Sequence, residues 1–389
     1  MSHTIESKLQ LTEVLDASMR AVKRKLLPLL AFSTVYRNVA LKGNDEFAVP
    51  FYPLAPVGSS VTRTPNGSRK ALASATTTES RSITSWTNKM QAISFTAKER
   101  ARQPQFNPEK HGQMKGEALA YDILGDIFSV VRASRYNSTT IAGVSSGNFD
   151  ENDVGDLRTI VANEFWPESG RSLILNPSYG TNLLKQPQII DASKRGDGGR
   201  SFRDGVIGEV LNFDVYESAG LQTNNGAPFN ITGEADDDTF TAAAHPLLNG
   251  DRVIFPTLTG GTGLTAATVE YFVRDVTTNT FKVSATVGGA ALNFTADVTA
   301  GTVRKYEDIQ GIAVLPSAIL IGFAPVPPTP AIRKELFEYE ELVDESGLVL
   351  QYYHFADPDT DEEVQTIECH YGYDVGDEAQ LKIIRGLLA

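Results

Sequence analysis

The stretch GEVLNFDVYES, residues 208–218, reads as a β-strand that should be followed at once by an apolar partner strand. The partner candidates are residues 312–315 and 319–321, which a long intervening segment separates from this strand. The intervening segment carries its own turn signals and short strand patterns, at residues 239–241, 252–255, 271–273, 281–283 and 298–303. Residues 226–305 are therefore predicted to form a small all-β domain inserted into a host domain.

The host begins with a helical pattern and a polar ribbon. Apolar residues at three-to-four spacing predict a helix over residues 8–27, ended by Pro28. Residues 58–89 are rich in Ser, Thr and Arg and too polar to build a core, yet they return into the alternating stretch 91–95. Residues 45–100 are thus predicted to be a two-stranded excursion, which needs a neighbour because an isolated ribbon is marginal in water.

The remaining host mixes helices and strands. Apolar spacing predicts a long helix from residue 108 to about 135, and a second helix near 156–164. Residues 172–175 read as a strand closed by Asn176-Pro177, followed by a helix to about 184. From residue 332 onward the chain alternates apolar and polar side chains, as strands do. The expected fold class is α+β.

Composition bears on the redox compartment of the protein and on whether it binds a membrane. The chain has 389 residues and one cysteine, Cys369, so no intramolecular disulfide forms, as expected for a protein made in a reducing cytosol. No stretch approaches eighteen apolar residues, and the N-terminus lacks a signal-peptide pattern, so no membrane partner is predicted.

The net charge of −13 is unevenly distributed. Residues 1–120 hold 17 Lys/Arg against 9 Asp/Glu, a net of +8, and residues 331–389 hold 4 against 15, a net of −11. Opposite ends of this kind favour docking of one copy's basic front half on another copy's acidic tail. Two solvated, independent charge regions are the simpler alternative.

Motifs that suggest chemistry are weak. Gly143-Val144-Ser145-Ser146-Gly147 matches a nucleophile elbow, but polar linker sequence flanks it where a strand and a helix are required. Asp357, Asp359, Asp361 and Glu368 match part of a calcium loop, but Glu362 stands where that loop needs glycine. The histidines show no metal-ligand spacing. No catalytic, cofactor-binding or metal residue is predicted, and no cofactor.

In their order, these elements resemble the major capsid proteins of tailed phages, with the Hong Kong 97-type fold. Residues 2–34 are similar to the N-arm, 45–97 to the extended loop, and 108–135 to the spine helix of the peripheral domain. Leu173 to Pro177 with Tyr179 resembles the axial-domain strand that ends in Asn-Pro, and 331–389 the returning peripheral strands. Residues 210–218 resemble a later axial strand, although Asn212-Phe213-Asp214 departs from the usual Gly-x-Pro-Val-type segment.

The resemblance implies a division into seven segments. They are an N-terminal arm (1–44), the extended loop (45–100), the spine helix and linker (101–150), a first axial part (151–225), the inserted domain (226–305), a second axial part (306–330) and the peripheral strands (331–389).

It also implies a structural protein and no enzyme. The expected function is self-assembly, as hexamers and pentamers, into the icosahedral shell that encloses phage double-stranded DNA. The implied partners are a separate scaffolding protein, a portal, decoration proteins and packaged DNA through non-specific contacts. The implied location is the virion, assembled in the host cytoplasm. An encapsulin-like nanocompartment shell, or a hydrolase using Ser145, are the alternatives.

Charge and apolar spacing predict which residues join neighbouring copies. These candidates are Leu11, Val14 and Leu15 of the arm, Arg63, Arg69, Lys70 and Arg81 of the loop, and Glu338, Glu340 and Glu341 of the tail. In the fold's founding member a loop lysine is joined covalently to a peripheral asparagine. Lys70 and Lys89 are available here, but residues 331–389 contain no asparagine, so no cross-link is expected.

Overall fold

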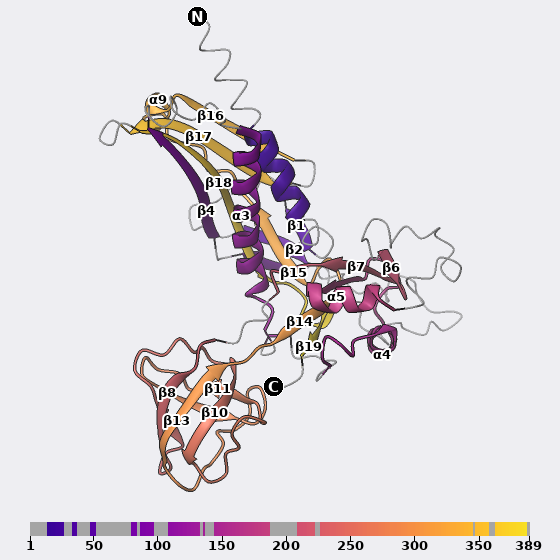
Figure 1. Ribbon diagram of the computed structural model, residues 1–389, viewed down its shortest axis with the longest axis vertical. Helices are drawn as coiled ribbons and strands as arrows, with labels where there is room; N and C mark the ends of the chain where they lie inside the picture. Colours follow the sequence, from indigo (N-terminus) through magenta and orange to yellow (C-terminus); the bar gives the residue numbers. More distant parts are fainter. Residues whose placement is uncertain are drawn as a thin grey trace, which may run out of the picture. The chain divides into compact units, whose positions relative to one another are not determined.

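The computed structural model describes residues 14–26, 33–36, 47–51, 79–83, 86–96, 108–132, 135–136, 144–186, 208–221, 226–344, 347–357 and 362–386 (Figure 1). They fall into two compact units. One comprises Met1–Ile127 with Pro316–Asp377, and the other comprises Phe128–Leu315 with Glu378–Ala389. Helices and mostly antiparallel sheets occur in both units, so the expected α+β class is confirmed.

A six-stranded sheet built from both ends of the chain organises the first unit. Its path runs β1-β15-β18-β17-β16, and β4 pairs with β18 from the other side. The strands are β1 (Ser33–Tyr36), β4 (Trp86–Thr96), β15 (Ile319–Phe323), β16 (Glu338–Val343), β17 (Val349–Asp357) and β18 (Glu362–Val375).

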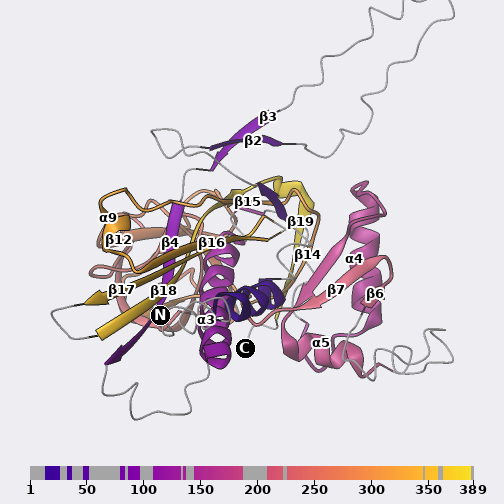
Figure 2. The same ribbon diagram turned by 90° about the horizontal axis from the view of Figure 1, so that it is seen from above.

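Two helices pack together in this unit. They are α3 (Pro108–Phe128) and the helical residues 14–26, which lie side by side in Figures 1 and 2. A Cβ added at Gly116 would lie 2.6 Å from Ser18 O, so the glycine permits a close crossing. Ser18 Oγ lies 2.7 Å from Val14 O and 2.9 Å from Gly112 O across the same crossing.

Helix α3 ends earlier than the sequence pattern predicts. It stops at Phe128, whereas the apolar spacing predicted a helix to about Arg135. Val130 and Val131 are buried but lie in a turn, where Val131 N donates to Phe128 O at 3.0 Å. Consecutive β-branched side chains disfavour a helix, so burial continues after the helix has ended.

Part of the expected two-stranded ribbon lies among the described residues. Strand β2 (Phe47–Phe51) pairs antiparallel with β3 (Glu79–Ile83), and Ile83 packs at the ribbon's base against Leu320. Residues 91–95 do not belong to it. They lie in β4, which pairs with β18 from Trp86 to Thr96. Alternation indicated a strand correctly, but it did not identify the partner.

The second unit contains a five-stranded sheet with two helices. The strand order is β19-β14-β5-β7-β6. Strand β5 (Ser172–Leu175) matches its prediction, because Asn176 caps the helix that follows and Pro177 opens it. The bounds of the others are β6 (Gly208–Val210), β7 (Phe213–Glu217), β14 (Ile309–Val314), β19 (Leu381–Arg385), α4 (Glu151–Asn163) and α5 (Pro177–Leu184), with a short 3₁₀ turn at Glu378–Gln380.

Two predictions in this unit need correction. Helix α4 begins at Glu151, earlier than the predicted 156, because Asp150 and Asp153 form a reciprocal capping box. Residues 208–218 are not one strand but the hairpin β6–β7. Its two turn residues, Leu211 and Asn212, have φ of 49° and 69°, the left-handed pair of a tight turn.

The expected pairing of residues 208–218 with 312–315 is also wrong. Strand β7 pairs with β5 and β6, whereas β14 pairs with β5 and β19. The predicted partner therefore lies in the same sheet, one strand away. Residues 319–321 form β15 in the other unit's sheet.

Between β7 and β14 the chain forms a closed barrel in the order β10-β11-β12-β9-β8-β13. Five of its strands overlap the predicted ones, and β8 was missed. The bounds are β8 (Phe229–Glu234), β9 (Thr239–Thr241), β10 (Arg252–Gly260), β11 (Tyr271–Arg274), β12 (Thr280–Ser284) and β13 (Val298–Lys305).

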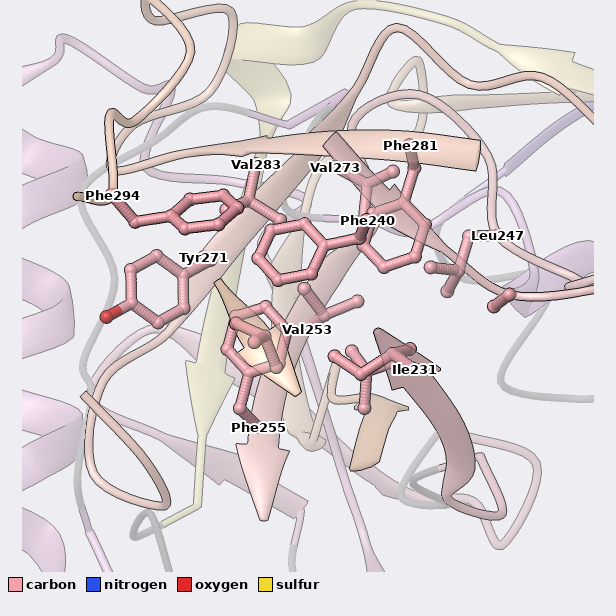
Figure 3. Packing of buried hydrophobic residues seen from close by; sticks show 13 residues of the cluster. Ile231, Phe240, Leu247, Val253, Phe255, Tyr271, Val273, Phe281, Val283 and Phe294 are labelled. Carbon is pink, nitrogen blue, oxygen red and sulfur yellow. The ribbon is translucent and has the colours of Figure 1, made fainter. Parts of the chain in front are cut away.

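Aromatic rings fill the interior of the barrel. Phe240 stacks on Phe255, Phe281 and Phe294 with ring centroids 5.1–5.3 Å apart, and all four side chains are fully buried (Figure 3). A barrel of this size is filled by its own side chains. The packed rings therefore form the core of the barrel.

The two ends of the barrel segment meet. Gly226 N donates to Lys305 O at 3.0 Å, which joins the first and last residues of the segment. Asp251, fully buried, accepts from Lys305 Nζ at 3.0 Å and Arg132 Nη1 at 3.2 Å. Because Arg132 follows α3 in the host, this carboxylate fastens the barrel to the rest of its unit.

Candidate functional site

The most distinctive surface of the first unit is an apolar groove on one face of its sheet. The floor comes from three adjacent strands, whose same-face residues stand in register. One row across the sheet is Ala92, Thr366 and Tyr353, and the next is Met90, Glu368 and Gln351. Alternation along each strand places these side chains on one face.

The wall of the groove is the segment that precedes β16. It includes Val326, Pro327, Pro328 and α9 (Ile332–Glu335). Val326 fixes it to the floor: its N–H donates to Gln351 Oε1 at 3.2 Å, and its carbonyl accepts from Tyr353 Oη at 3.2 Å. The wall is therefore held in place by two hydrogen bonds to β17.

The groove has a volume of about 650 Å³ and is open to solvent. Met90, Val326 and Ile332 line it and are 61%, 47% and 51% exposed. Large apolar side chains gathered around one concavity mark a surface for contact with another molecule.

One polar group in the groove lacks a partner. Thr366 is 5% exposed, and its Oγ1 has no hydrogen-bond partner among the described residues. A buried hydroxyl without a partner costs free energy of folding. The neighbouring Tyr353 hydroxyl is already used by Val326, and burial followed by the Glu368 carboxylate raises its pKa, so it stays a donor.

Helix α3 covers the opposite face of the same strands. Lys89 Nζ lies 3.1 Å from Asp126 Oδ2 of α3, and Tyr371 Oη donates to the same oxygen at 2.7 Å. Buried side chains of β18 such as Ile367 and Cys369 lie on this face. Burial raises the pKa of the Cys369 thiol, which stays protonated. The helix therefore covers one face of the sheet, and the groove lies on the other.

Strand β16, the last strand of the sheet path, carries the predicted acidic residues. Glu341 stands opposite Gln351 and so lies on the groove face, where it is exposed. Glu338 and Glu340 alternate to the other face and are half-buried. The three carboxylates thus do not act as one cluster, although all line the edge of the sheet.

The predicted contact residues of the arm are buried within one chain where the structure describes them. Val14 and Leu15 are 2% and 1% exposed inside a single chain, so they form no exposed surface for a neighbour. Leu11 lies outside the described residues. Lys23 of the same helix pairs with Asp344 at 2.9 Å, so part of the charge asymmetry is used within one chain.

The predicted loop residues are not placed. Arg63, Arg69 and Lys70 lie outside the described residues, and only the backbone of Arg81 is described, in β3 opposite Val49. Their role as contacts between copies stays a prediction.

The structure adds no support for the nucleophile-elbow or calcium-loop motifs. Ser145 begins a turn in which its carbonyl accepts from Asn148 N and Phe149 N, and residues 137–143, where the nucleophile elbow requires a strand, lie outside the described residues. Glu368 lies well inside β18, while Asp359 and Asp361 fall outside the described residues. No group of three metal-ligating side chains occurs in the described part of the chain, and none of its helices meets the length and apolarity of a membrane span.

Sequence reasoning missed the groove itself. Its floor draws on residues 88–92, 351–355 and 364–368, which become neighbours only through strand pairing. The run Val326-Pro327-Pro328 was a usable signal, because prolines outside helices mark an extended segment that can form a wall.

No protein-family model and no curated protein matches the chain. Solved structures do match over nearly the whole length. The capsid of Cyanophage P-SCSP1u matches with a TM-score of 0.48 at 11% identity, covering 92% of this chain and 87% of that one. The mature capsid of bacteriophage PhiM1 matches with 0.43 at 11%, covering 91% and 85%.

A virus-like particle from Pyrococcus furiosus also matches, with a TM-score of 0.43 at 10% identity, covering 96% of this chain and 97% of that one. All three proteins form shells, by their descriptions. Because the scores lie below 0.5, a function for this chain has to be argued from its own residues.

Proposed function

We propose that this chain is the major capsid protein of a tailed phage, with a Hong Kong 97-type fold, which self-assembles into the icosahedral shell around double-stranded DNA. The observation that carries the proposal is the composition of the six-stranded sheet. Strands β1 and β4 from the front of the chain pair with β15 and β18 from its end, and the second unit is formed by Phe128–Leu315 together with Glu378–Ala389.

That arrangement reproduces the order on which the sequence resemblance rests. A helix, a two-stranded ribbon, a long helix, a mixed sheet with an insertion and closing strands follow one another along the chain. The ribbon supports the proposal further, because two strands projecting from a sheet are marginal alone and gain stability against a neighbouring copy.

The surface of the first unit fits a protein that works by contact. It presents an open apolar groove and a strand edge with an exposed carboxylate. Interfaces combine such apolar centres with polar rims. A separate scaffolding protein, a portal and non-specific DNA contacts are the partners that this function brings with it.

Negative-stain electron microscopy tests the proposal. The purified chain, alone and together with a candidate scaffolding protein from the same source, should give closed shells of uniform size. A chain that stays monomeric in both samples would overturn it. Shells that enclose a protein cargo in place of DNA in the producing cell would favour the nanocompartment alternative.

A further inference from the structure

A second carboxylate of the barrel is shared between barrel and host, as Asp251 is. Glu270, the residue before β11, places its Oε2 3.3 Å from Arg252 Nε of the barrel and 2.7 Å from Arg385 Nη1. Arg385 is the last residue of β19, in the host sheet. Each of these two barrel carboxylates therefore bridges one cation of the barrel and one cation of the host.

The bridge at Glu270 is largely shielded from water. The side chains of Arg252, Arg385 and Glu270 are 3%, 17% and 26% exposed. Salt screens partly buried charges less than exposed ones, and removal of one member of such a group leaves the others without their counter-charge. The bridge therefore favours the barrel orientation in which the three side chains meet.

The end of β19 also contacts the connection through which the chain leaves the barrel. Gly386 N donates to Asp308 O at 3.3 Å, and Asp308 lies between β13 and β14 with a φ of 42°. A Cβ added at Gly386 would lie 2.2 Å from Asp308 Oδ2, so this close approach requires glycine. Arg385 and Gly386 thus hold both the barrel and its exit.

The core of the barrel is built without these contacts. Its buried apolar cluster, with the partly buried side chains packed against it, consists of residues between 229 and 303. A body with a core of its own can change orientation without repacking, and motion relative to its host is the default unless a large apolar interface prevents it. The orientation of the barrel then depends on contacts at its surface.

We propose that Arg385 and Gly386 at the end of β19, together with Arg132, form a latch that fixes the orientation of the inserted barrel. With the latch closed, the barrel has one orientation. With the latch open, it turns as a rigid body about residues 306–308 while its core stays intact. The latch acts within one chain, so it does not depend on the proposed function.

The two host cations of the latch lie where the chain enters the second unit. That unit begins at Phe128, shortly before Arg132, and resumes at Glu378, shortly before Arg385. A rearrangement of either segment moves a cation of the latch, and opening the latch frees the barrel. The latch therefore converts a change at these segments into a change of barrel orientation.

Distances between two spin labels test the latch. The labels are attached at Thr241→Cys, exposed in β9, and at Asn163→Cys, exposed at the end of α4. The native Cys369 is buried and stays unlabelled. Labelled chain is diluted with unlabelled chain, so that double electron–electron resonance measures distances within one copy. A single narrow distance peak is expected from the chain with an intact latch.

Two pairs of substitutions are then compared. Arg132→Gln with Arg385→Gln removes both host cations of the latch, and the narrow peak should be lost to a broad distribution. The matched control, Arg158→Gln with Lys185→Gln, removes the same charge from exposed sites of the same unit and should keep the peak. Near-UV circular dichroism should be the same for both, because neither pair touches the aromatic core of the barrel.

The latch predicts a broadened peak with an unchanged near-UV spectrum. A narrow peak in the latch variant, or a broad one in the parent chain, would overturn the proposal. Equal broadening in the control would overturn it as well, because the effect would then follow from net charge. Loss of the near-UV signal in the latch variant also contradicts it, since the pairs would then hold the barrel together and not merely in place.

Discussion

The inserted barrel has no free strand edge, whereas the six-stranded sheet is open at its edges. The barrel closes on itself and encloses its aromatic core, so every strand has two neighbours. The sheet is open, with β16 ending its path and an apolar groove on one face. Closure removes the strand edges that another chain can use, whereas an open sheet keeps them. The closed barrel needs no further strand, and under the proposed function the contacts with other copies fall to the open sheet unit.

The largest expected effect falls on the open unit. Replacing Arg63, Arg69 and Arg81 by glutamate should abolish shell assembly while leaving a folded monomer, because the reversed loop is repelled by the neighbours' acidic strands. Each exposed pair contributes only ~0.2–1 kcal/mol, but the pairs repeat in every copy. Analytical ultracentrifugation and circular dichroism measure the two outcomes.

Salt provides the control for that reversal. Screening shortens from about 10 Å at 0.1 M to about 3 Å at 1 M, so parent-chain assembly should slow as salt rises. Normal shells from the triple variant would show that the charge asymmetry serves solvation only.

Within the barrel, Phe240→Ala should destabilise the module by about 3–5 kcal/mol, because the ring contacts three other buried rings. The exposed Phe165 is the matched control, and Phe165→Ala should change the free energy of unfolding little. Urea unfolding followed by aromatic circular dichroism measures both. Equal effects would contradict a self-contained aromatic core.

A smaller loss is expected where the barrel is fastened to its unit. Asp251→Ala leaves Arg132 and Lys305 without their shared carboxylate and should cost about 1–3 kcal/mol. The cations are partly exposed, which limits the loss. Thermal unfolding should show it, and an unchanged midpoint would mean that the buried carboxylate does not fasten the barrel.

The last prediction is that no covalent cross-link forms between copies. Particles boiled in detergent should run as a single monomer band, because residues 331–389 offer no asparagine to a loop lysine. Lys89, one of the two lysines considered, is already paired with Asp126 within its chain. A ladder of covalent multimers on the gel would refute this expectation.

Local sequence signals predicted the elements better than their partners. Strand β5 was placed correctly because Asn176-Pro177 ends it, and β9 because polar turns flank it. The turn Leu211-Asn212 was missed, since leucine seldom takes a positive φ. Residues 91–95 were assigned to the ribbon because alternation does not reveal that their partner lies in β18. The groove could not be predicted from the sequence for the same reason, because strand pairing brings its residues together.

The central claim is that the open sheet unit builds the shell and the barrel is an addition to it. It is tested most directly by replacing residues 228–304 with a short Gly-Ser bridge, which the contact between Gly226 and Lys305 permits. Electron microscopy of that variant, assembled beside the parent chain, should show closed shells from both. Closed shells from the parent and only folded monomers from the variant would contradict the account.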